Sequence, residues 1–442
     1  VARVAYATAL WIKENTDNHS AVVGFDCRFG GKLFSETTIS IFISEGITVY
    51  TSDSFVSTPM VSLSTLKHKA YTGIVITASH NPPSYNGFKI KAHYGGPAIQ
   101  SEINAVEAKI PKEFTPEIIP FDELKKHDLV QMIDMEQEYI DHVKKHFDIE
   151  KINSCGLNFG YDAMYGAGQN IIRRLIPNAI LLHAEHNPSF EGQAPEPIAR
   201  NLKAFSKLIS ETDISSGLAT DGDADRIGLF DENGKFVDSH HIILLLIRYL
   251  VEFKQEKGNV YTSFSCTSKI KSICDHYGLE HHVTKIGFKY ICEEMISNPT
   301  LLGGEESGGI AVSSHIPERD GIWMGLILWE YMANTGKSLN TLIQEVYQIT
   351  GSFAMDRYDL HVPESQKLDI INQCKEKSYS QFGNYPVTGH EDIDGYKFLL
   401  NEDNWVMIRP SGTEPVLRVY AQADNVNEVK QILDATKETI LA

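Results

Sequence analysis

The sequence has no long apolar run and no excess of basic residues, and each shortage excludes a class of protein. No stretch of its 442 residues approaches the ~20 consecutive apolar residues that a membrane-spanning helix needs, and the longest candidate, residues 242–251, is interrupted by Arg248. Lysine and arginine number 40 against 58 aspartates and glutamates, so the formal net charge is −18. We therefore expect no membrane and no nucleic-acid partner, because nucleic acid requires a basic surface.

Cysteine is also scarce, and its spacing excludes two kinds of small scaffold. The six cysteines form no C-x-x-C pair, which argues against a zinc ribbon and against a disulfide framework. Small buried apolar residues would account for all six. We expect a reducing, cytoplasmic setting for a chain with the composition of a globular protein, 42% hydrophobic and 22% charged.

Short apolar runs rich in β-branched residues alternate with helical patterns along most of the chain. This alternation begins near residue 21 and restarts near residues 157 and 258. It indicates βαβ units and sheets that are largely parallel. After Gly351 strands and helices follow a different order, which is typical of a separate α+β domain. A length of 442 residues suits about three or four domains of roughly 100–200 residues each.

The stretch YTGIVITASHNPPSYNGFKI, residues 71–90, predicts a strand that ends in a tight turn. A turn at the carboxyl edge of a sheet can present Ser79 to a ligand, with His80 beside it. Asn86-Gly87 predicts a two-residue hairpin turn, which would bring Lys89 and Lys91 back toward the serine. We interpret Ser79 as a serine that carries a covalent group. A serine in an ordinary polar turn is an equal alternative, because short motifs often occur by chance.

The stretch ATDGDADRIGLFDENG predicts a metal site. Asp221, Asp223 and Asp225 alternate, so their carboxylates can converge on a hard divalent cation. Without a cation they would repel one another. An EF-hand calcium loop is a weak alternative: Glu232 fits its twelfth position, but Arg226 stands where that loop needs glycine. A solvated acidic turn is a third interpretation.

Two further glycine-containing loops carry polar side chains suited to a sugar phosphate. In LLGGEESGGI, Glu305 and Ser307 could bind sugar hydroxyls, although an ordinary glycine-rich turn explains the pattern equally well. In IRPSGTEPVLRV, Arg409 can bind phosphate through two hydrogen bonds. The neighbouring Ser411, Gly412 and Thr413 can form an anion nest, and a surface turn is the alternative there.

Together the four loops resemble the α-D-phosphohexomutase superfamily, which comprises phosphoglucomutases and phosphomannomutases. The phosphoserine motif T-A-S-H-N-P is matched by residues 77–82, and the metal motif D-G-D-x-D-R by residues 221–226. The sugar motif G-E-x-S-G is matched by residues 304–308, and the phosphate motif R-P-S-G-T-E-P by residues 409–415. Four motifs in the family's order, spanning nearly the whole chain, are highly specific.

The resemblance implies an α/β architecture, with three similar mixed-sheet α/β domains and a C-terminal α+β domain around a central cleft. The family usually opens with a segment of the type F-G-T-x-G-x-R, which does not precede Val1, so we expect the first domain to lack it here. We expect the domains to carry, in order, the phosphoserine, metal, sugar and phosphate loops, over residues 1–135, 136–255, 256–352 and 353–442.

The resemblance also implies the roles of individual residues. It implies the phosphorylated serine Ser79; the Mg²⁺ ligands Asp221, Asp223 and Asp225 together with the phosphate on Ser79; the candidate proton-transfer groups His80 and Lys89; the phosphoryl-binding Arg226; the sugar-binding Lys289, Glu305 and Ser307; and the phosphate-binding Arg409, Ser411, Gly412 and Thr413.

The implied activity is interconversion of hexose 1-phosphate and hexose 6-phosphate through a 1,6-bisphosphate, which would also act as activator. The motif G-E-E-S-G and Lys289 in KIGFKYI favour glucose phosphate, with mannose phosphate or dual specificity as the alternative. We expect sugar phosphates as the small-molecule partners of a monomer or homodimer. A sugar-phosphate phosphatase and a non-catalytic sugar-phosphate binder remain the rival classes.

Overall fold

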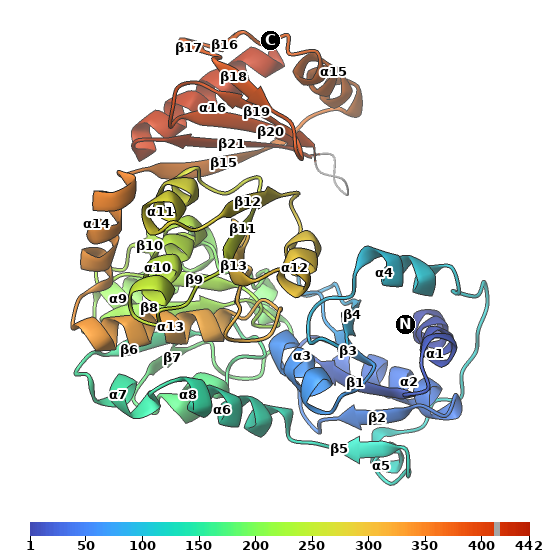
Figure 1. Ribbon diagram of the computed structural model, residues 1–442. Helices are drawn as coiled ribbons and strands as arrows, with labels where there is room; N and C mark the ends of the chain where they lie inside the picture. Colours follow the sequence, from blue (N-terminus) through green and yellow to red (C-terminus); the bar gives the residue numbers. More distant parts are fainter. Residues whose placement is uncertain (411–415) are drawn as a thin grey trace.

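The first α/β unit of the computed structural model, which describes residues 1–410 and 416–442, is a five-stranded sheet with helices on both faces (Figure 1). The strand order is β4-β3-β1-β2-β5, parallel except for β4. Ala21 and Val23 of β1 pack toward α1 and α2, while Val22 packs toward α3, so consecutive residues are buried on opposite faces. The elements are α1 (Ala2–Asn15), β1 (Ser20–Phe25), α2 (Gly31–Ser44), β2 (Thr48–Thr51), α3 (Thr58–Lys67), β3 (Thr72–Ile76), β4 (Phe88–Ala92), α4 (Gln100–Glu107), α5 (Phe121–Leu124) and β5 (Val130–Met132).

The second unit is a sheet in the order β10-β9-β8-β6-β7, in which β6, β7 and β8 are parallel and β9 is antiparallel to β8. Phe205 and Ile209 of α9 cover one face, and α13 packs against β8 and β9 on the other. The elements are α6 (Met135–His146), α7 (Ile149–Ser154), β6 (Phe159–Asp162), α8 (Ile171–Leu175), β7 (Ile180–Leu182), η1 (Phe190–Gly192), η2 (Ala199–Asn201), α9 (Lys203–Ser210), β8 (Ser216–Thr220), β9 (Ile227–Phe230) and β10 (Phe236–Val237).

The third unit is a four-stranded sheet in the order β12-β11-β13-β14, with only β14 antiparallel to its neighbour. Phe288 and Ile291 of α12 pack on Tyr261 at one face of the sheet. The larger helices α10 and α13 belong to the continuous core shared with the second unit. The elements are α10 (Ser239–Glu252), β11 (Asn259–Ser263), α11 (Lys269–Tyr277), β12 (His281–Thr284), α12 (Phe288–Ser297), β13 (Thr300–Gly304), β14 (Ile310–Val312), α13 (Gly321–Thr335) and α14 (Leu339–Thr350).

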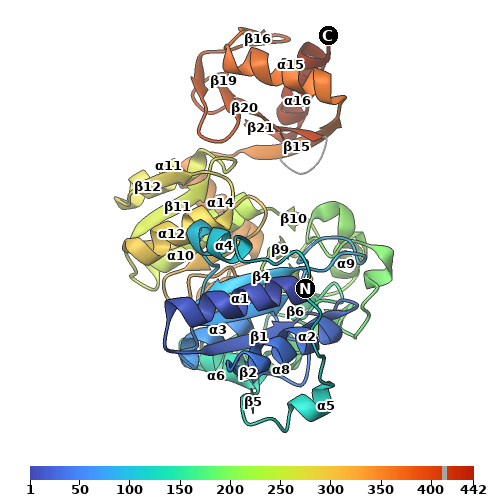
Figure 2. The same ribbon diagram turned by 90° about the vertical axis from the view of Figure 1, so that its right-hand side faces the viewer.

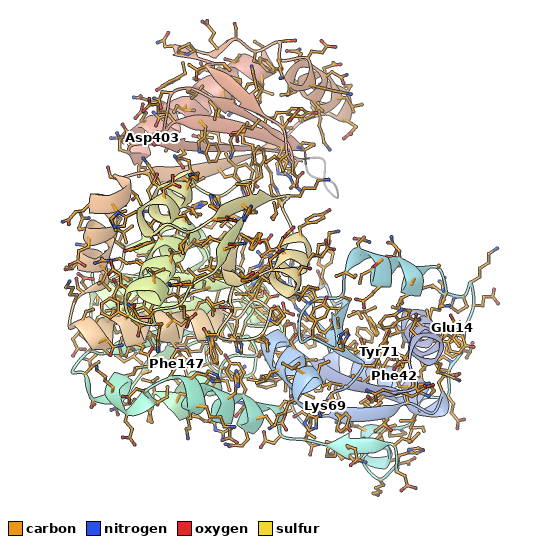
Figure 3. The ribbon with its side chains drawn as sticks, in the orientation of Figure 1. Glu14, Phe42, Lys69, Tyr71, Phe147 and Asp403 are labelled. Atoms are coloured by element: carbon orange, nitrogen blue, oxygen red, sulfur yellow. The ribbon has the colours of Figure 1, made fainter. Side chains whose placement is uncertain are left out.

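The fourth unit is an antiparallel sheet in the order β15-β21-β20-β19-β18, and it rests on the third unit with β15 on the near side (Figures 1 and 2). Trp405 and Tyr420 pack on Phe264 of the third unit, and Lys269 lies 2.6 Å from Asp403, which Figure 3 labels at this junction. The elements are β15 (Ala354–His361), α15 (Glu364–Lys375), β16 (Gln381–Phe382), β17 (Tyr385–Pro386), β18 (Gly389–Glu391), β19 (Tyr396–Leu399), β20 (Trp405–Pro410), β21 (Val416–Ala423) and α16 (Val426–Leu441).

The first three units repeat one strand order. Each has three parallel strands and a fourth, antiparallel strand beside the third: β2-β1-β3-β4, β7-β6-β8-β9 and β12-β11-β13-β14. The predicted three similar α/β domains and the α+β domain are therefore confirmed. Among residues 1–410 and 416–442, no helix has both the length and the apolar character needed to cross a bilayer.

The predicted two-residue hairpin at Asn86-Gly87 is wrong. Strands β3 and β4 do pair antiparallel, but residues 77–87 connect them as a long loop. The last residue of this loop, just before β4, must be a glycine. A Cβ at Gly87 would lie 2.7 Å from the carbonyl oxygen of Thr77. The apolar sequence pattern ends at residue 76 and therefore marks the end of β3. It does not show how long the following loop is, because that length depends on tertiary contacts.

Lys91 does not face Ser79; it forms a buried ion pair between the first and third units. Its Nζ lies 2.5 Å from Glu318 Oε2, and Ser62 Oγ donates to the same oxygen at 3.0 Å. The side chains of Lys91 and Glu318 are 2% and 0% exposed, so Lys91 depends on Glu318 for compensation of its charge, whereas Glu318 also has Arg319 Nε at 3.9 Å.

We expect Lys91→Met to lower the free energy of unfolding by about 3–5 kcal/mol, because the buried Glu318 loses the cation at 2.5 Å and keeps only the more distant Arg319 Nε at 3.9 Å. The double variant Lys91→Met/Glu318→Met should recover most of that loss. Urea unfolding checks both, with Lys13→Met as the control, since Lys13 and Glu45 form an exposed pair that contributes less than about 1 kcal/mol. Equal stability of Lys91→Met and the unmodified protein would contradict the prediction.

Candidate active site

Three of the predicted loops are equivalent connections in the three α/β units. Each joins the third parallel strand to the antiparallel fourth strand: residues 77–87, 221–226 and 305–309. Because the units repeat one topology, these loops occupy the same sheet edge in each unit. The first loop opens on a pocket of about 370 Å³, which is lined by Thr77, Ala78, Ser79, His80, Asn81, Tyr85, Asn86, Gly87, Phe88, Lys89, Arg226 and Arg319.

Ser79 follows β3 in a left-handed backbone conformation, with φ +52°. This conformation costs an L-residue roughly 1–2 kcal/mol, so surrounding contacts must hold it. The Ser79 N–H donates to Thr77 Oγ1 at 2.9 Å, and Ser79 Oγ donates to Asp221 Oδ2 at 2.6 Å. The serine of the first unit therefore lies directly against the metal loop of the second unit.

The three aspartates of the metal loop converge as the sequence predicts. Asp221, Asp223 and Asp225 are fully buried, and each offers an oxygen within 4.8 Å of the others. Gly222 permits the contact with the serine loop, because a Cβ at this position would lie 2.5 Å from the carbonyl oxygen of Ser79. The EF-hand alternative is wrong: β8 precedes the loop in place of a helix, and residues 227–230 form β9.

Burial and neighbouring charges separate the pKa values of the three aspartates. Burial, together with the charges of Asp223 and Asp225, raises the pKa of Asp221 well above its ordinary value. Burial opposes ionisation of Asp223 as well, but Lys89 at 2.8 Å and the Thr58 hydroxyl at 2.6 Å hold the pKa of Asp223 below its ordinary value.

Asp225 is ionised for a similar reason, and two carboxylate oxygens in the cluster have no partner. Burial opposes its charge, but Arg319 at 2.5 Å lowers the pKa of Asp225 below its ordinary value. The Oδ1 atoms of Asp223 and Asp225 are buried without a hydrogen-bond partner in the structure. Unpaired carboxylate oxygens at this spacing are the ligands that a hard dication prefers, so the residues fit Mg²⁺.

Lys89, His80 and Arg226 surround the serine at the pocket. Lys89 lies 2.8 Å from Asp223 and 3.4 Å from Asp225; although burial favours the neutral amine, these carboxylates raise the pKa of Lys89 above its ordinary value. Burial and then Arg226 lower the pKa of His80 to about 3, so its imidazole is neutral at neutral pH. Arg226 lines the same pocket.

The sugar loop places its two glutamates on different sides. Glu305 Oε1 accepts the backbone N–H of Gly287 at 3.0 Å, and its Oε2 lies 3.7 Å from Arg319. Burial raises the pKa of Glu305 to about 7, although Arg319 opposes the rise. Glu306, the second glutamate of the motif G-E-E-S-G, instead accepts the Ser263 hydroxyl at 3.0 Å and is therefore hydrogen-bonded at the end of β11.

Three other predicted residues lie around this region. Ser307 is partly buried within the sugar loop. Lys289 does not line the pocket: its Nζ donates to Gln100 Oε1 at 2.6 Å, which joins α12 to α4 where the two helices lie side by side (Figure 1). Arg409 lies on the fourth unit, where its guanidinium binds Asp394 at 3.2 and 3.3 Å. Ser411, Gly412 and Thr413 lie outside the described residues.

Arg319 is a site residue that the sequence motifs did not identify. It lines the pocket and bridges the metal and sugar loops through Asp225 and Glu305. The signal was present in HIPERDGIW, where the charged residues 318–320 directly precede the apolar helix α13. A run of charged residues at the start of a helix is also typical of helix capping. Asp320 does cap α13, because it accepts the Trp323 N–H. The pattern alone therefore gives no reason to place Arg319 in the site.

Comparison with known families matches four successive models over most of the chain. They are described as phosphoglucomutase/phosphomannomutase, alpha/beta/alpha domain I over residues 1–117, domain II over residues 137–234, domain III over residues 238–349, and the C-terminal domain over residues 360–439.

Individual relatives match along nearly their whole length. A phosphoglucomutase/phosphomannomutase of Thermococcus kodakarensis is 28% identical over 98% of this chain and 91% of its own. A phosphoglucosamine mutase of Methanocaldococcus jannaschii is 30% identical over 98% of this chain and 93% of its own. A crystal structure from Thermus thermophilus, provisionally described as a phosphomannomutase, superposes with a TM-score of 0.87 at 31% identity and covers 100% of this chain and 94% of that one.

Proposed function

The chain belongs to the phosphoglucomutase/phosphomannomutase family, whose members are isomerases, and from this premise we propose that it interconverts hexose 1-phosphate and hexose 6-phosphate through a phosphoserine at Ser79. The observation that carries the proposal is the 2.6 Å contact between Ser79 Oγ and Asp221 within a buried triad of carboxylates. A hydroxyl held against a cation site is suited to carry a phosphoryl group, because positioning and charge neutralisation do most of the work of phosphoryl transfer.

The proposed reaction consists of two transfers. In the first, a hydroxyl oxygen of the hexose monophosphate attacks the phosphorus on Ser79, the P–O bond to Ser79 Oγ breaks, and a P–O bond to the sugar forms. The proton of the sugar hydroxyl passes to neutral His80, and His80 delivers this proton to Ser79 Oγ, which leaves as the serine hydroxyl. The bisphosphate then reorients within the site, and the phosphoryl group on its other oxygen is transferred back to Ser79 by the reverse step.

The surrounding cations support this chemistry. Lys89 and Arg226 border the serine, where positive charge stabilises the equatorial oxygens of a transferring phosphoryl group. Asp221, Asp223 and Asp225 would hold Mg²⁺, which neutralises negative charge on that group when bound. We propose Glu305 and Ser307 for the sugar hydroxyls. Arg409, with the loop that follows it, is proposed for the phosphate that does not react.

The proposed substrate is glucose phosphate, with mannose phosphate or dual specificity as the alternative. Its support is the sequence pattern around Glu305 and Lys289. Glu306 accepts hydrogen bonds from the hydroxyls of Ser263 and Ser265, and these contacts give no further support for glucose. The test is turnover of glucose, mannose and glucosamine 1-phosphates with Mg²⁺ and catalytic glucose 1,6-bisphosphate, the proposed activator. We expect the highest kcat/KM for glucose 1-phosphate. Release of inorganic phosphate without isomerisation would identify a phosphatase and contradict the proposal.

We expect the KM for hexose phosphate to fall as the pH rises through about 7. The folded pKa of Glu305 is raised to about 7 by burial, so below this pH the side chain is protonated and above it both oxygens accept hydrogen bonds from sugar hydroxyls. Glu305→Gln should remove this part of the pH dependence. Kinetics of both proteins between pH 6 and 8 check it, since titration of the substrate phosphate affects both equally; identical profiles would contradict the assignment.

A further inference from the structure

One buried guanidinium binds four carbonyl groups of the loop that carries Ser79. Arg28 Nη2 donates to the carbonyl oxygens of Ser79 at 2.5 Å and Asn81 at 2.7 Å, and its Nη1 donates to those of Pro82 at 2.9 Å and Tyr85 at 3.2 Å. The Arg28 side chain is 0% exposed. Both terminal nitrogens of the guanidinium therefore donate to the backbone of residues 79–85.

Asp26 holds the same arginine in place and is also linked to Ser79 through the Thr77 hydroxyl. Asp26 Oδ1 accepts the Arg28 N–H at 3.0 Å, and Asp26 Oδ2 lies 3.3 Å from Arg28 Nε. Thr77 Oγ1 donates to Asp26 Oδ2 at 2.6 Å and accepts the Ser79 N–H at 2.9 Å. Strands β1 and β3 are parallel neighbours, so their carboxyl ends bring Asp26, Thr77 and Arg28 to one edge of the sheet.

Arg28 also lies where the first and second units meet. Its guanidinium carbon is 5.0 Å from the ring centre of Phe190, which belongs to the second unit. Gly222, next to Asp221, approaches the carbonyl oxygen of Ser79 so closely that a Cβ would lie 2.5 Å from it and 3.5 Å from Arg28 Nη2. A shift of Arg28 would therefore change the distance between Ser79 and the metal loop.

We infer that Arg28 is a positioning residue for phosphoryl transfer: by binding four carbonyls at once it holds residues 79–85 so that Ser79 Oγ stays aligned with Asp221. The carbonyl dipoles converge on one point, and without a cation between them they would repel. A lysine cannot replace this arrangement, because its ammonium has three donors on one atom whereas the planar guanidinium spreads five. The inference rests on the proposed function, since it assigns a role within that reaction.

The test uses Arg28→Ala and Arg28→Lys, with Arg173→Ala as the control because Arg173 donates to a single carbonyl, that of Ala184, elsewhere in the fold. We expect both Arg28 variants to lose about 100-fold in kcat with little change in KM, since the loop moves while the sugar-binding residues do not. Added guanidinium, far below denaturing concentrations, should restore at least about a tenth of the lost kcat to Arg28→Ala by filling the same cavity. It should not restore Arg28→Lys, whose side chain occupies that cavity.

Hydrogen exchange of the amides in residues 79–86 provides a readout besides activity. Exchange should be faster in Arg28→Ala than in the unmodified protein, and guanidinium should slow it again. A near-normal kcat in Arg28→Ala would overturn the inference. So would a loss of kcat that guanidinium does not restore, if hydrogen exchange is then faster throughout the chain and not only in residues 79–86. Failure of the unmodified protein to isomerise any hexose phosphate would instead overturn the proposed function.

Discussion

Replacing Ser79 by alanine is expected to lower kcat by about 10⁵- to 10⁶-fold, the scale on which enzymes respond to loss of a covalent nucleophile. The reason is that the proposed phosphoryl carrier is the Ser79 hydroxyl, which lies 2.6 Å from Asp221 Oδ2. Binding of hexose phosphate should remain, because Glu305 and Arg409 are unchanged. The measurements are steady-state kinetics, binding calorimetry and the intact mass after incubation with glucose 1,6-bisphosphate, which should increase by one phosphate only when Ser79 is present.

Ser84→Ala is the matched control, since Ser84 is an exposed serine of the same loop that has no contact with the aspartates. It should keep both turnover and the mass increase. The rival classes give different patterns. A phosphatase would lose activity in Ser79→Ala but would release phosphate from the unmodified protein, and a binder would show no turnover in either. Full isomerase activity of Ser79→Ala would contradict the covalent mechanism.

The positions of the proposed phosphoryl carrier and of its proposed cation ligands could be predicted from the sequence. Ser79 and the three aspartates could be singled out because their two motifs occur with two others in the order of one family, and the structure brings these side chains together across two units. The repeating βα pattern likewise predicted the three α/β units, since apolar runs buried on both faces of a sheet are visible without any tertiary information.

The residues that act through tertiary contacts could not be predicted in this way. Arg28 and Arg319 each lie between a strand and a helix, where a charged residue ordinarily faces solvent. Arg28 is instead buried under the loop that carries Ser79, and Arg319 bridges Asp225 and Glu305 of different units. Lys91 was expected near Ser79 because it shares a strand face with Lys89, but the third unit supplies Glu318 as its partner. Sequence spacing places such residues on an element but does not tell what packs against that element.

Removing Mg²⁺ is expected to lower kcat by about 10²- to 10³-fold, because a bound dication contributes several kcal/mol to stabilising charge in a phosphoryl transition state. Kinetics before and after chelation, with Mg²⁺ added back, measure this loss. Thermal unfolding gives a second readout that does not depend on turnover. A ligand that binds only the folded state at 100 times its Kd stabilises it by about 2.7 kcal/mol, so saturating Mg²⁺ should raise Tm.

The Tm response assigns the cation to the carboxylate cluster. In Asp223→Asn one of the two unpartnered oxygens is lost along with a charge, so Mg²⁺ should no longer raise Tm and kcat should fall as it does on chelation. Asp231→Asn is the control: Asp231 is also buried, but its carboxylate accepts the N–H groups of Asn233 and Lys235 in the turn after β9, and its variant should keep the Mg²⁺ response. If Tm of the unmodified protein did not change with Mg²⁺ and kcat survived chelation, the triad would not be a metal site, and the paired charges of Lys89 and Arg319 would have to neutralise the phosphoryl group alone.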